Sequence, residues 1–210
     1  MELPRETEEN IVVVVGLGNP GKQYENTRHN AGFLVVDRLV QQLGIGLQER
    51  KFKAGWGAGQ VGGRKVHFVK PLTFMNRSGE AIGEILRYFG LPVSGMLVVH
   101  DDLDLPPGQL RLVRGGGPGG HKGVSSIITH VGTRDFPRLK LGIGKPALKE
   151  HVEVFVLQPP FADELNVFEQ MIDLGAEAVR SLLVAGLSAA MNRVNRKKSP
   201  VVAPESQSGC

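Results

Sequence analysis

The stretch that decides the fold is IVVVVGLGNPGKQYENTRHNAGF, which covers residues 11–33. Its first five residues are apolar and β-branched and are followed by Gly16, a pattern typical of a strand buried on both faces of an α/β sheet. From Ala31 the apolar residues recur with helical spacing, Asn30 stands at the N-cap position, and Gly44 follows the last turn. The sequence therefore predicts a strand, a polar loop and a helix in succession.

The rest of the chain alternates between strand and helix patterns in the same way. A hairpin is expected around Gly62 and Gly63, and a second helix should end at Gly90, with Asn76 or Ser78 as its cap. We expect strands over 58–61, 65–69, 96–99, 111–113 and 139–143, and later helices over roughly 163–183 and up to about 194. This order predicts an α/β fold with a twisted mixed β-sheet covered by α-helices.

The chain contains no internal repeat and no linker, so we predict a single domain over residues 11–195. We expect residues 1–10 to be a flexible acidic N-terminus and residues 196–210 a basic and then disordered tail. The only cysteine is Cys210, so no disulfide can form within the chain. The N-terminus resembles neither a signal peptide nor a transit peptide, and no apolar stretch is long enough to span a bilayer. We therefore expect a soluble, cytoplasmic protein.

The charge of the chain favours a polyanionic partner. Formal net charge is +4, but the first ten residues hold four glutamates and one arginine. The rest of the chain therefore carries 24 of the 25 Lys and Arg residues against 17 of the 21 Asp and Glu residues. This excess suits a nucleic acid, yet mildly basic domains that bind no anion are common, so the motifs have to decide.

The glycine-rich loop after the first strand has the spacing G-x-G-x-x-G at Gly16, Gly18 and Gly21, which is found in dinucleotide sites. In those sites the helix begins at the loop, whereas about ten polar residues precede Ala31 here. The acidic residue expected about 20 positions further on would be Asp37, which falls inside the helical pattern. We therefore do not favour a dinucleotide site.

His29 is the first candidate for chemistry, because it lies in a loop immediately before a helix and outside any apolar pattern. Histidine acts as a general base near neutral pH, since its unperturbed pKa is about 6.5. From this segment alone, an idle loop residue bonded to the neighbouring backbone is an equally good interpretation.

Asp101, Asp102 and Asp104 form the strongest acidic cluster and follow a predicted buried strand. One of these carboxylates could accept the ring N–H of His29 and orient the ring. Two alternatives stay open: the cluster could hold a divalent cation, or Asp102 and Asp104 could merely build turns. Because the ends of strands gather at one rim of such folds, we expect this cluster and the loop over 18–30 to lie close together.

Two further loops carry polar groups. Met75 and Asn76 come just before the second helix, where an asparagine is either a cap or an amide that positions substrate. The glycine-rich loop over 115–123 offers backbone N–H groups that can approach a phosphate or an oxyanion. Lys122 and two arginines, Arg111 and Arg114, give this loop a basic border.

Six motifs follow one another along the chain: GLGNPG with YENTRHNAGF, KPLTFMNRSGEA, HDDLDLPPG, GGGPGGHKG and FPRLKLGIGKP. Together, over residues 11–195, they resemble the bacterial-type peptidyl-tRNA hydrolase family. The resemblance implies a monomeric α/β enzyme that needs no metal or other cofactor. Its expected substrate is peptidyl-tRNA, whose ester between peptide and tRNA it would cleave to release tRNA for reuse.

The resemblance also implies roles for residues at matching positions. His29 matches the catalytic base, Asp101 the carboxylate that orients it, and Asn19 and Asn76 the amides that position substrate. Two more residues match positions that line the substrate cleft, Tyr24 and Met75.

The sequence departs from the family pattern at Lys122, where many members have asparagine in G-G-H-N-G. An ammonium can donate a hydrogen bond to an oxyanion but cannot accept one from a water molecule. We therefore expect Lys122 to bind substrate or an oxyanion rather than to position the water.

These residues predict direct attack by water, which His29 deprotonates while Asp101 holds its ring. The chain has no G-x-S-x-G elbow, and its cysteine lies in the tail, so a covalent acyl-enzyme has no candidate nucleophile. We expect tRNA phosphates to contact Arg111, Arg114, Lys122, Arg193, Arg196, Lys197 and Lys198.

Two alternative functions stay open. One is a non-catalytic RNA-binding or splicing factor of the same fold, and the other is a metal-dependent phosphoesterase built on the aspartates.

Overall fold

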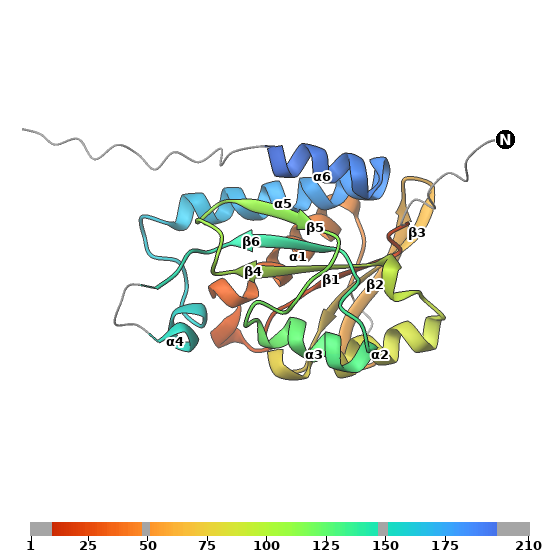
Figure 1. The fold of residues 1–210 in the computed structure, drawn as a ribbon, viewed down its shortest axis with the longest axis horizontal. Helices are drawn as coiled ribbons and strands as arrows, with labels where there is room; N and C mark the ends of the chain where they lie inside the picture. The colour runs from red at the N-terminus through yellow and green to blue at the C-terminus, as the bar shows by residue number, and fades with distance from the viewer. Residues whose placement is uncertain (1–9, 48–50, 147–150, 197–210) are drawn as a thin grey trace, which may run out of the picture.

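The computed structural model describes residues 10–47, 51–146 and 151–196, and it has a six-stranded sheet with the strand order β2-β3-β1-β4-β6-β5 (Figure 1). The strands are β1 (Val13–Gly16), β2 (Ala54–Val61), β3 (Arg64–Pro71), β4 (Met96–Asp102), β5 (Leu110–Val113) and β6 (Arg138–Gly142). Strand β1 pairs in parallel with β3 and β4, and β4 pairs in parallel with β6. The edge strands β2 and β5 are antiparallel to their neighbours, so the sheet is mixed, as predicted.

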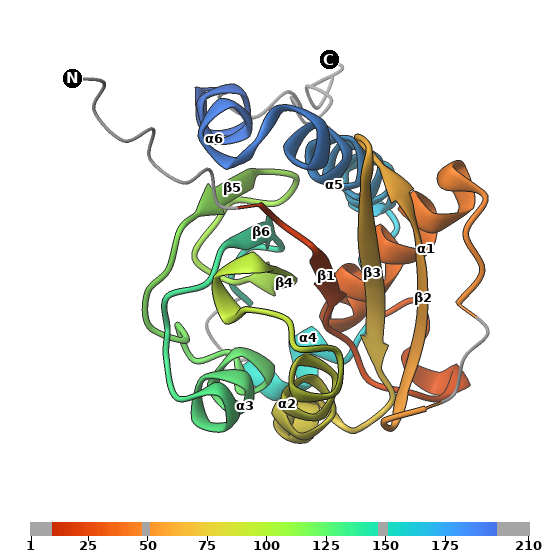
Figure 2. The ribbon, with the colours of Figure 1, turned by 90° about the vertical axis from the view of Figure 1, so that its right-hand side faces the viewer.

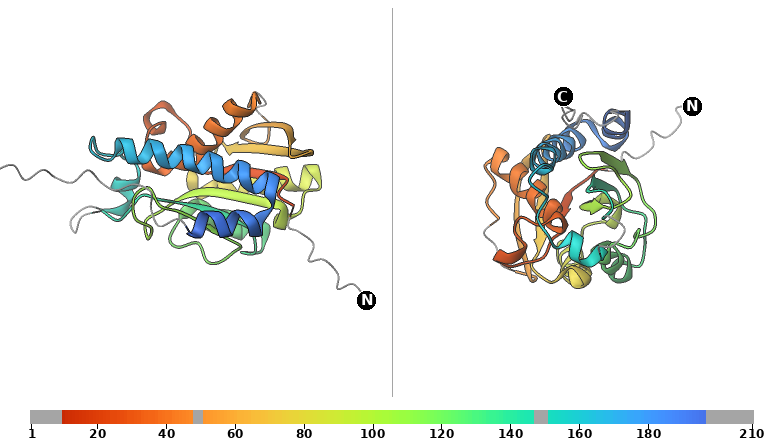
Figure 3. Two further views of the ribbon diagram at one scale, coloured as in Figure 1. Left: turned by 90° about the horizontal axis from the view of Figure 1, so that it is seen from above. Right: turned by 90° about the vertical axis from the view of Figure 1, so that its left-hand side faces the viewer.

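Helices cover both faces of this sheet, which makes three layers. Figure 2 shows α2 and α3 together on one face and α5 and α6 on the other, and Figure 3 shows α5 and α6 from two further sides. The helices are α1 (Ala31–Leu43), α2 (Ser78–Phe89), α3 (Lys122–Val131), α4 (Val152–Val156), α5 (Leu165–Ala185) and α6 (Leu187–Arg196). Each face buries its own apolar cluster, because the side chains of β1 and β4 point alternately into one cluster and the other.

Helix α1 packs unusually close to the sheet, and this contact positions the loop that precedes it. A Cβ on Gly32 would overlap the carbonyl oxygen of Val99 in β4 and the backbone of Leu17 just after β1. Only glycine fits there without displacing the helix. The first turn of α1 is therefore held directly over the ends of β1 and β4.

Most predicted elements are confirmed, but two helix caps and the bounds of several strands differ, such as β2, which begins at Ala54. Asn30 does stand at the N-cap position of α1, yet its side chain does not cap the helix, because it bonds the backbone of Asn19 instead. Neither Asn76 nor Ser78 caps α2, where Arg77 occupies the N-cap position. Strand β4 continues beyond its predicted end at Val99 to Asp102, because residues 98–102 pair with β6.

The sequence did not predict α4, whose five residues are too few to show a helical period. None of the helices within residues 10–47, 51–146 and 151–196 is long and apolar enough to cross a membrane. The predictions for the flexible N-terminus and the disordered tail, including Lys197 and Lys198, fall outside these ranges apart from the residues at their borders.

Candidate active site

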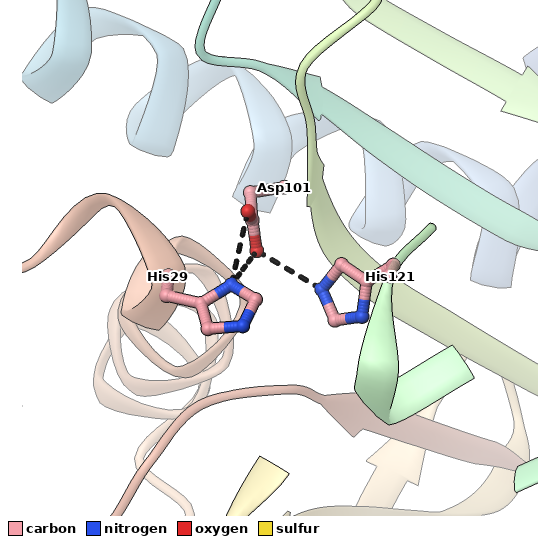
Figure 4. Close-up of side chains that lie close together, drawn as sticks. All are labelled: His29, Asp101 and His121. Carbon is pink, nitrogen blue, oxygen red and sulfur yellow. Dashed lines mark hydrogen bonds and ion pairs between the residues drawn. The ribbon is translucent and has the colours of Figure 1, made fainter. Parts of the chain in front are cut away.

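A histidine and an aspartate meet at the rim where β1 and β4 end (Figure 4). His29 lies in the short 3-10 turn Arg28–Asn30, directly before α1, and Asp101 lies near the end of β4. Nδ1 of His29 is 2.9 Å from one carboxylate oxygen of Asp101 and 3.0 Å from the other. Both side chains are buried. The sequence therefore predicted correctly that these two segments share one rim.

His121 binds the same carboxylate from the opposite side. Its Nε2 is 3.1 Å from Oδ1 of Asp101. Its Nδ1 accepts the backbone N–H groups of Gly123 and Val124 at the start of α3, at 3.1 and 3.3 Å. Because Nδ1 accepts, the ring proton of His121 sits on Nε2 and is donated to Asp101.

The pKa values of the pair reflect this packing. Burial raises the pKa of the Asp101 carboxyl, but the neighbouring rings of His29 and His121 outweigh burial and hold it far below its usual range. Burial lowers the pKa of His29, yet attraction to Asp101 and the hydrogen bond between them outweigh burial. Lys122 opposes Asp101 by lowering the pKa of His29, and the net effect is a pKa above the ordinary 6.5. Asp101 is thus an anion at neutral pH, poised to stabilise an imidazolium.

The second ring nitrogen of His29, Nε2, has no hydrogen-bond partner within residues 10–47, 51–146 and 151–196. Since Nδ1 carries the proton that Asp101 accepts, Nε2 holds the lone pair in the neutral ring. Figure 4 shows this nitrogen on the side of the ring away from Asp101. His29 is therefore arranged as a general base with a fixed tautomer.

His29 lines a cavity of about 490 Å³. The cavity is bounded by segments 74–76, 100–103 and 118–122 and by α4, together with Asn19. Its outer wall is apolar and open to solvent, since Phe74 is 57% exposed and Val152 of α4 is 47% exposed. A base at the floor and apolar walls at the mouth suit a substrate that has a reactive carbonyl and an apolar chain.

Asn19 joins two walls of this cavity. Its Oδ1 accepts the backbone N–H of Met75 at 2.8 Å, and its own backbone bonds the side chain of Asn30 in both directions. Its Nδ2 has no hydrogen-bond partner among the described residues, so this amide N–H is available to a substrate. Met75 is buried and Asn76 is exposed, and both line the cavity.

Lys122 also lines the cavity, but its ammonium is tied to the opposite wall. Nζ lies 2.6 Å from Oε1 of Glu153 in α4, and both side chains are largely exposed. This contact spans 31 residues, so the sequence carried no signal for it. The ion pair bridges α3 and α4 across the mouth of the cavity.

The remaining predicted binding residues lie elsewhere. Tyr24 is half-buried in the 3-10 turn Lys22–Tyr24 and is not among the residues that line this cavity. Arg111 belongs to the edge strand β5, and Arg114 directly follows it. Arg193 and Arg196 belong to α6. None of these four arginines is among the residues that line the cavity.

Only one of the three clustered aspartates faces His29. Asp102 accepts the backbone N–H of Asp104 in a turn, and the two carboxylates also pair with Lys140 at 2.6 Å and Lys145 at 2.9 Å, which the sequence did not predict. In the described part of the chain, one group of side chains could hold a metal ion, namely His29, Asp101 and His121, with ligand atoms within 4.8 Å of one another. In this structure the two rings hydrogen-bond the carboxylate that lies between them, through Nδ1 of His29 and Nε2 of His121.

Comparison with known proteins gives one consistent family. Residues 13–201 match the family model described as peptidyl-tRNA hydrolase. The chain is similar to the peptidyl-tRNA hydrolase of Moorella thermoacetica, with 50% identity over 186 residues that cover 88% of this chain and 98% of that protein. It is 42% identical to the peptidyl-tRNA hydrolase of Bacillus subtilis over 187 residues, which cover 89% of this chain and all of the other.

A comparison of folds gives the same family. The crystal structure of peptidyl-tRNA hydrolase from Acinetobacter baumannii matches with a TM-score of 0.86 and 38% identity, covering 93% of this chain and 100% of that one.

Proposed function

The chain belongs to the peptidyl-tRNA hydrolase family, and we propose that it hydrolyses the ester bond between the peptide and the tRNA of peptidyl-tRNA. The observation that carries this proposal is the triad of His29, Asp101 and His121 at the floor of an open cavity. A splicing factor or another non-catalytic RNA binder of this fold would have no need for a buried base with a fixed tautomer, so that alternative is not favoured.

The proposed reaction begins with proton transfer from a water molecule to Nε2 of His29. The water oxygen forms a bond to the acyl carbonyl carbon, and the carbonyl oxygen takes up negative charge. When the intermediate collapses, the bond from carbon to the ribose oxygen breaks, and the imidazolium returns its proton to that oxygen. The products are a free peptide carboxyl and a tRNA with an intact terminal hydroxyl.

Asp101 and His121 prepare this base. The anionic carboxylate stabilises the imidazolium that forms in the first step and holds Nδ1 protonated, so that Nε2 is always the reactive nitrogen. His121 keeps the carboxylate in place from the other side. General base catalysis of this kind contributes roughly 10²- to 10⁴-fold.

The amides around the cavity position the substrate. Because all three line the cavity, we assign Nδ2 of Asn19 and the side chain of Asn76 as donors to the acyl and ribose oxygens and Met75 as a contact of the peptide chain of the substrate. Lys122 supplies a positive charge near the developing oxyanion, provided that it leaves Glu153 when substrate binds. Tyr24 stays a proposed substrate contact outside the cavity itself.

Phosphate contacts are proposed for the basic surface formed by β5 and α6. Asn195 of α6 bonds the backbone of Leu112 at 2.9 Å in both directions, which joins the helix to the edge strand. Arg111 and Arg196 are exposed on this surface. Two neighbours are partly engaged, since Arg193 pairs with Glu177 and Arg114 donates to Ser188. Lys197 and Lys198 follow Arg196 in the sequence and stay proposed phosphate contacts outside the described residues.

We further propose that residues 11–195 act as a monomer in the cytoplasm and need no metal.

The test of the proposed function is cleavage of peptidyl-tRNA by the protein, by His29→Ala and by Asp101→Asn, with and without a chelator. We expect both variants to lose at least about 100-fold in kcat and the chelator to have no effect. Near-normal cleavage by His29→Ala would refute the mechanism, and loss of activity with chelator would favour the metal-dependent rival.

A further inference from the structure

Arg28, the residue just before His29, is a buried cation that the proposed reaction does not use. It is 1% exposed, and its guanidinium lies between two aromatic rings, 4.1 Å from the centroid of Phe155 and 4.6 Å from that of Phe161. Such stacking suits the flat, weakly hydrated guanidinium and not a lysine ammonium.

The side-chain hydrogen bonds of Arg28 lead to the segment 155–164, between α4 and the start of α5. Nη1 donates to the carbonyl oxygens of Phe155 at 3.3 Å and Pro159 at 2.8 Å. Nη2 donates to Oε2 of Glu164 at 2.7 Å, at the N-cap position of α5. The backbone N–H of Arg28 donates to the carbonyl oxygen of Gln158 at 3.0 Å.

That segment contains a wall of the active-site cavity. Helix α4 has only five residues, yet Val152, Glu153, Val156 and the adjoining Leu157 all line the cavity. A helix of one turn is unstable by itself and takes its place from tertiary contacts. Arg28 supplies several of these contacts at the carboxyl end of α4 and along the chain up to α5.

We infer that Arg28 is a positioning residue. It holds the 3-10 turn Arg28–Asn30, which carries His29, and the α4 wall of the cavity in one fixed arrangement. The inference rests on the proposed function of His29. The distance between the base and the peptide chain of the substrate then depends on this guanidinium as well as on the backbone bond from Arg28 to Gln158. A looser Arg28 site then changes both the placement of the base and the binding of the peptide.

A merely structural role would look different. Burying an ion pair stabilises a fold little, and apolar side chains of similar size often serve as well. A substitution such as Arg28→Met would then change the melting temperature and leave kcat and KM of the folded protein unchanged.

The experiment compares Arg28→Lys, Arg28→Met and the matched control Arg38→Met by kcat, KM and melting temperature with peptidyl-tRNA. Arg38 also ties a helix to α5, through Glu169 and Asp173, but it lies outside the cavity. We expect both Arg28 variants to lose at least tenfold in kcat and to raise KM, measured well below their melting temperatures. Arg38→Met should keep both parameters within about twofold.

Two further measurements separate positioning from folding. If His29 loosens from Asp101, its pKa moves down toward the ordinary value, so the acid limb of the pH profile shifts to lower pH in the Arg28 variants only. If the Arg28 variants do not fold, Glu164→Gln replaces them in the test. It removes the negative charge that Arg28 binds but keeps the shape of the side chain, and we expect kcat to fall about threefold or more.

Unchanged kcat and KM in the folded Arg28 variants, or in Glu164→Gln where those do not fold, would overturn the inference. The proposed function fails by a different result, namely retained cleavage by His29→Ala, so the two failures are distinguishable.

Discussion

His121 donates its Nε2 proton to Asp101 because its other nitrogen, Nδ1, accepts from the first turn of α3. The N-cap contact thus selects the tautomer that the carboxylate needs. One ring therefore connects the start of a helix to the orientation of the catalytic base.

This relationship predicts that His121→Ala weakens catalysis through Asp101. Oδ1 would lose one of its two donors, so the carboxylate and the ring of His29 would be less firmly placed. We expect kcat to fall about tenfold, and the loss of the cap to reduce the free energy of unfolding by about 1 kcal/mol.

His121→Asn is the matched variant, since asparagine is a good N-cap and carries its own N–H donor. It should recover the stability and part of kcat in denaturant unfolding and single-turnover assays. Equal kcat for the wild type and both variants would show that Asp101 needs no second donor.

Lys122 gives a prediction about pH. Its charge lowers the pKa of His29, so Lys122→Met should raise that pKa. Because the base works unprotonated, the acid limb of the kcat profile should move to higher pH. Glu153→Gln frees the ammonium of its partner and should move the limb to lower pH. Shifts in the same direction for both variants would contradict this electrostatic account.

Gly32 gives a prediction about stability. A methyl group at this position would overlap Val99 and Leu17, so Gly32→Ala has to push α1 away from the sheet. We expect a loss of about 2 kcal/mol or more in the free energy of unfolding, measured in urea, and lower kcat because His29 precedes the displaced helix. Gly83→Ala in α2 is the control, since its Cβ would meet only ordinary contacts at 3.7 Å. A stable, fully active Gly32→Ala would contradict the close packing.

The sequence predicted the parts of the site that follow directly from strand ends. The apolar run before Gly16 placed the His29 loop at a rim, and the run before His100 placed Asp101 at the same rim. It did not distinguish a capping Asn30 from one that braces Asn19, because both use the same amide at the same position.

The contacts that the sequence missed are those between distant segments. His121 follows a run of glycines with no apolar pattern, so the sequence did not predict that it caps α3 and bonds Asp101. The contacts of Arg28 with Pro159 and Glu164 span more than 130 residues, and no local periodicity reports such a distance. Short helices such as α4 depend on these contacts, which explains why the wall of the cavity was not foreseen.

The basic surface on β5 and α6 gives the last prediction. Arg111 and Arg196 are exposed there, whereas Arg193 already pairs with Glu177. If Arg111 and Arg196 neutralise tRNA phosphates, Arg111→Met and Arg196→Met should each raise KM with little change in kcat. Each should also reduce, by about 1, the slope of the logarithm of the tRNA binding constant against the logarithm of the salt concentration.

Arg87→Met is the control, since Arg87 is an exposed arginine of α2 on the other face of the sheet. It lowers the net charge equally but should leave the salt slope unchanged. The measurement is KM for peptidyl-tRNA at several salt concentrations, together with cleavage of a short peptidyl ester that lacks the tRNA body. Because that ester carries no distant phosphates, its cleavage should be insensitive to all three substitutions. An equal effect of Arg87→Met on the salt slope would mean that overall charge, and not this surface, attracts the tRNA.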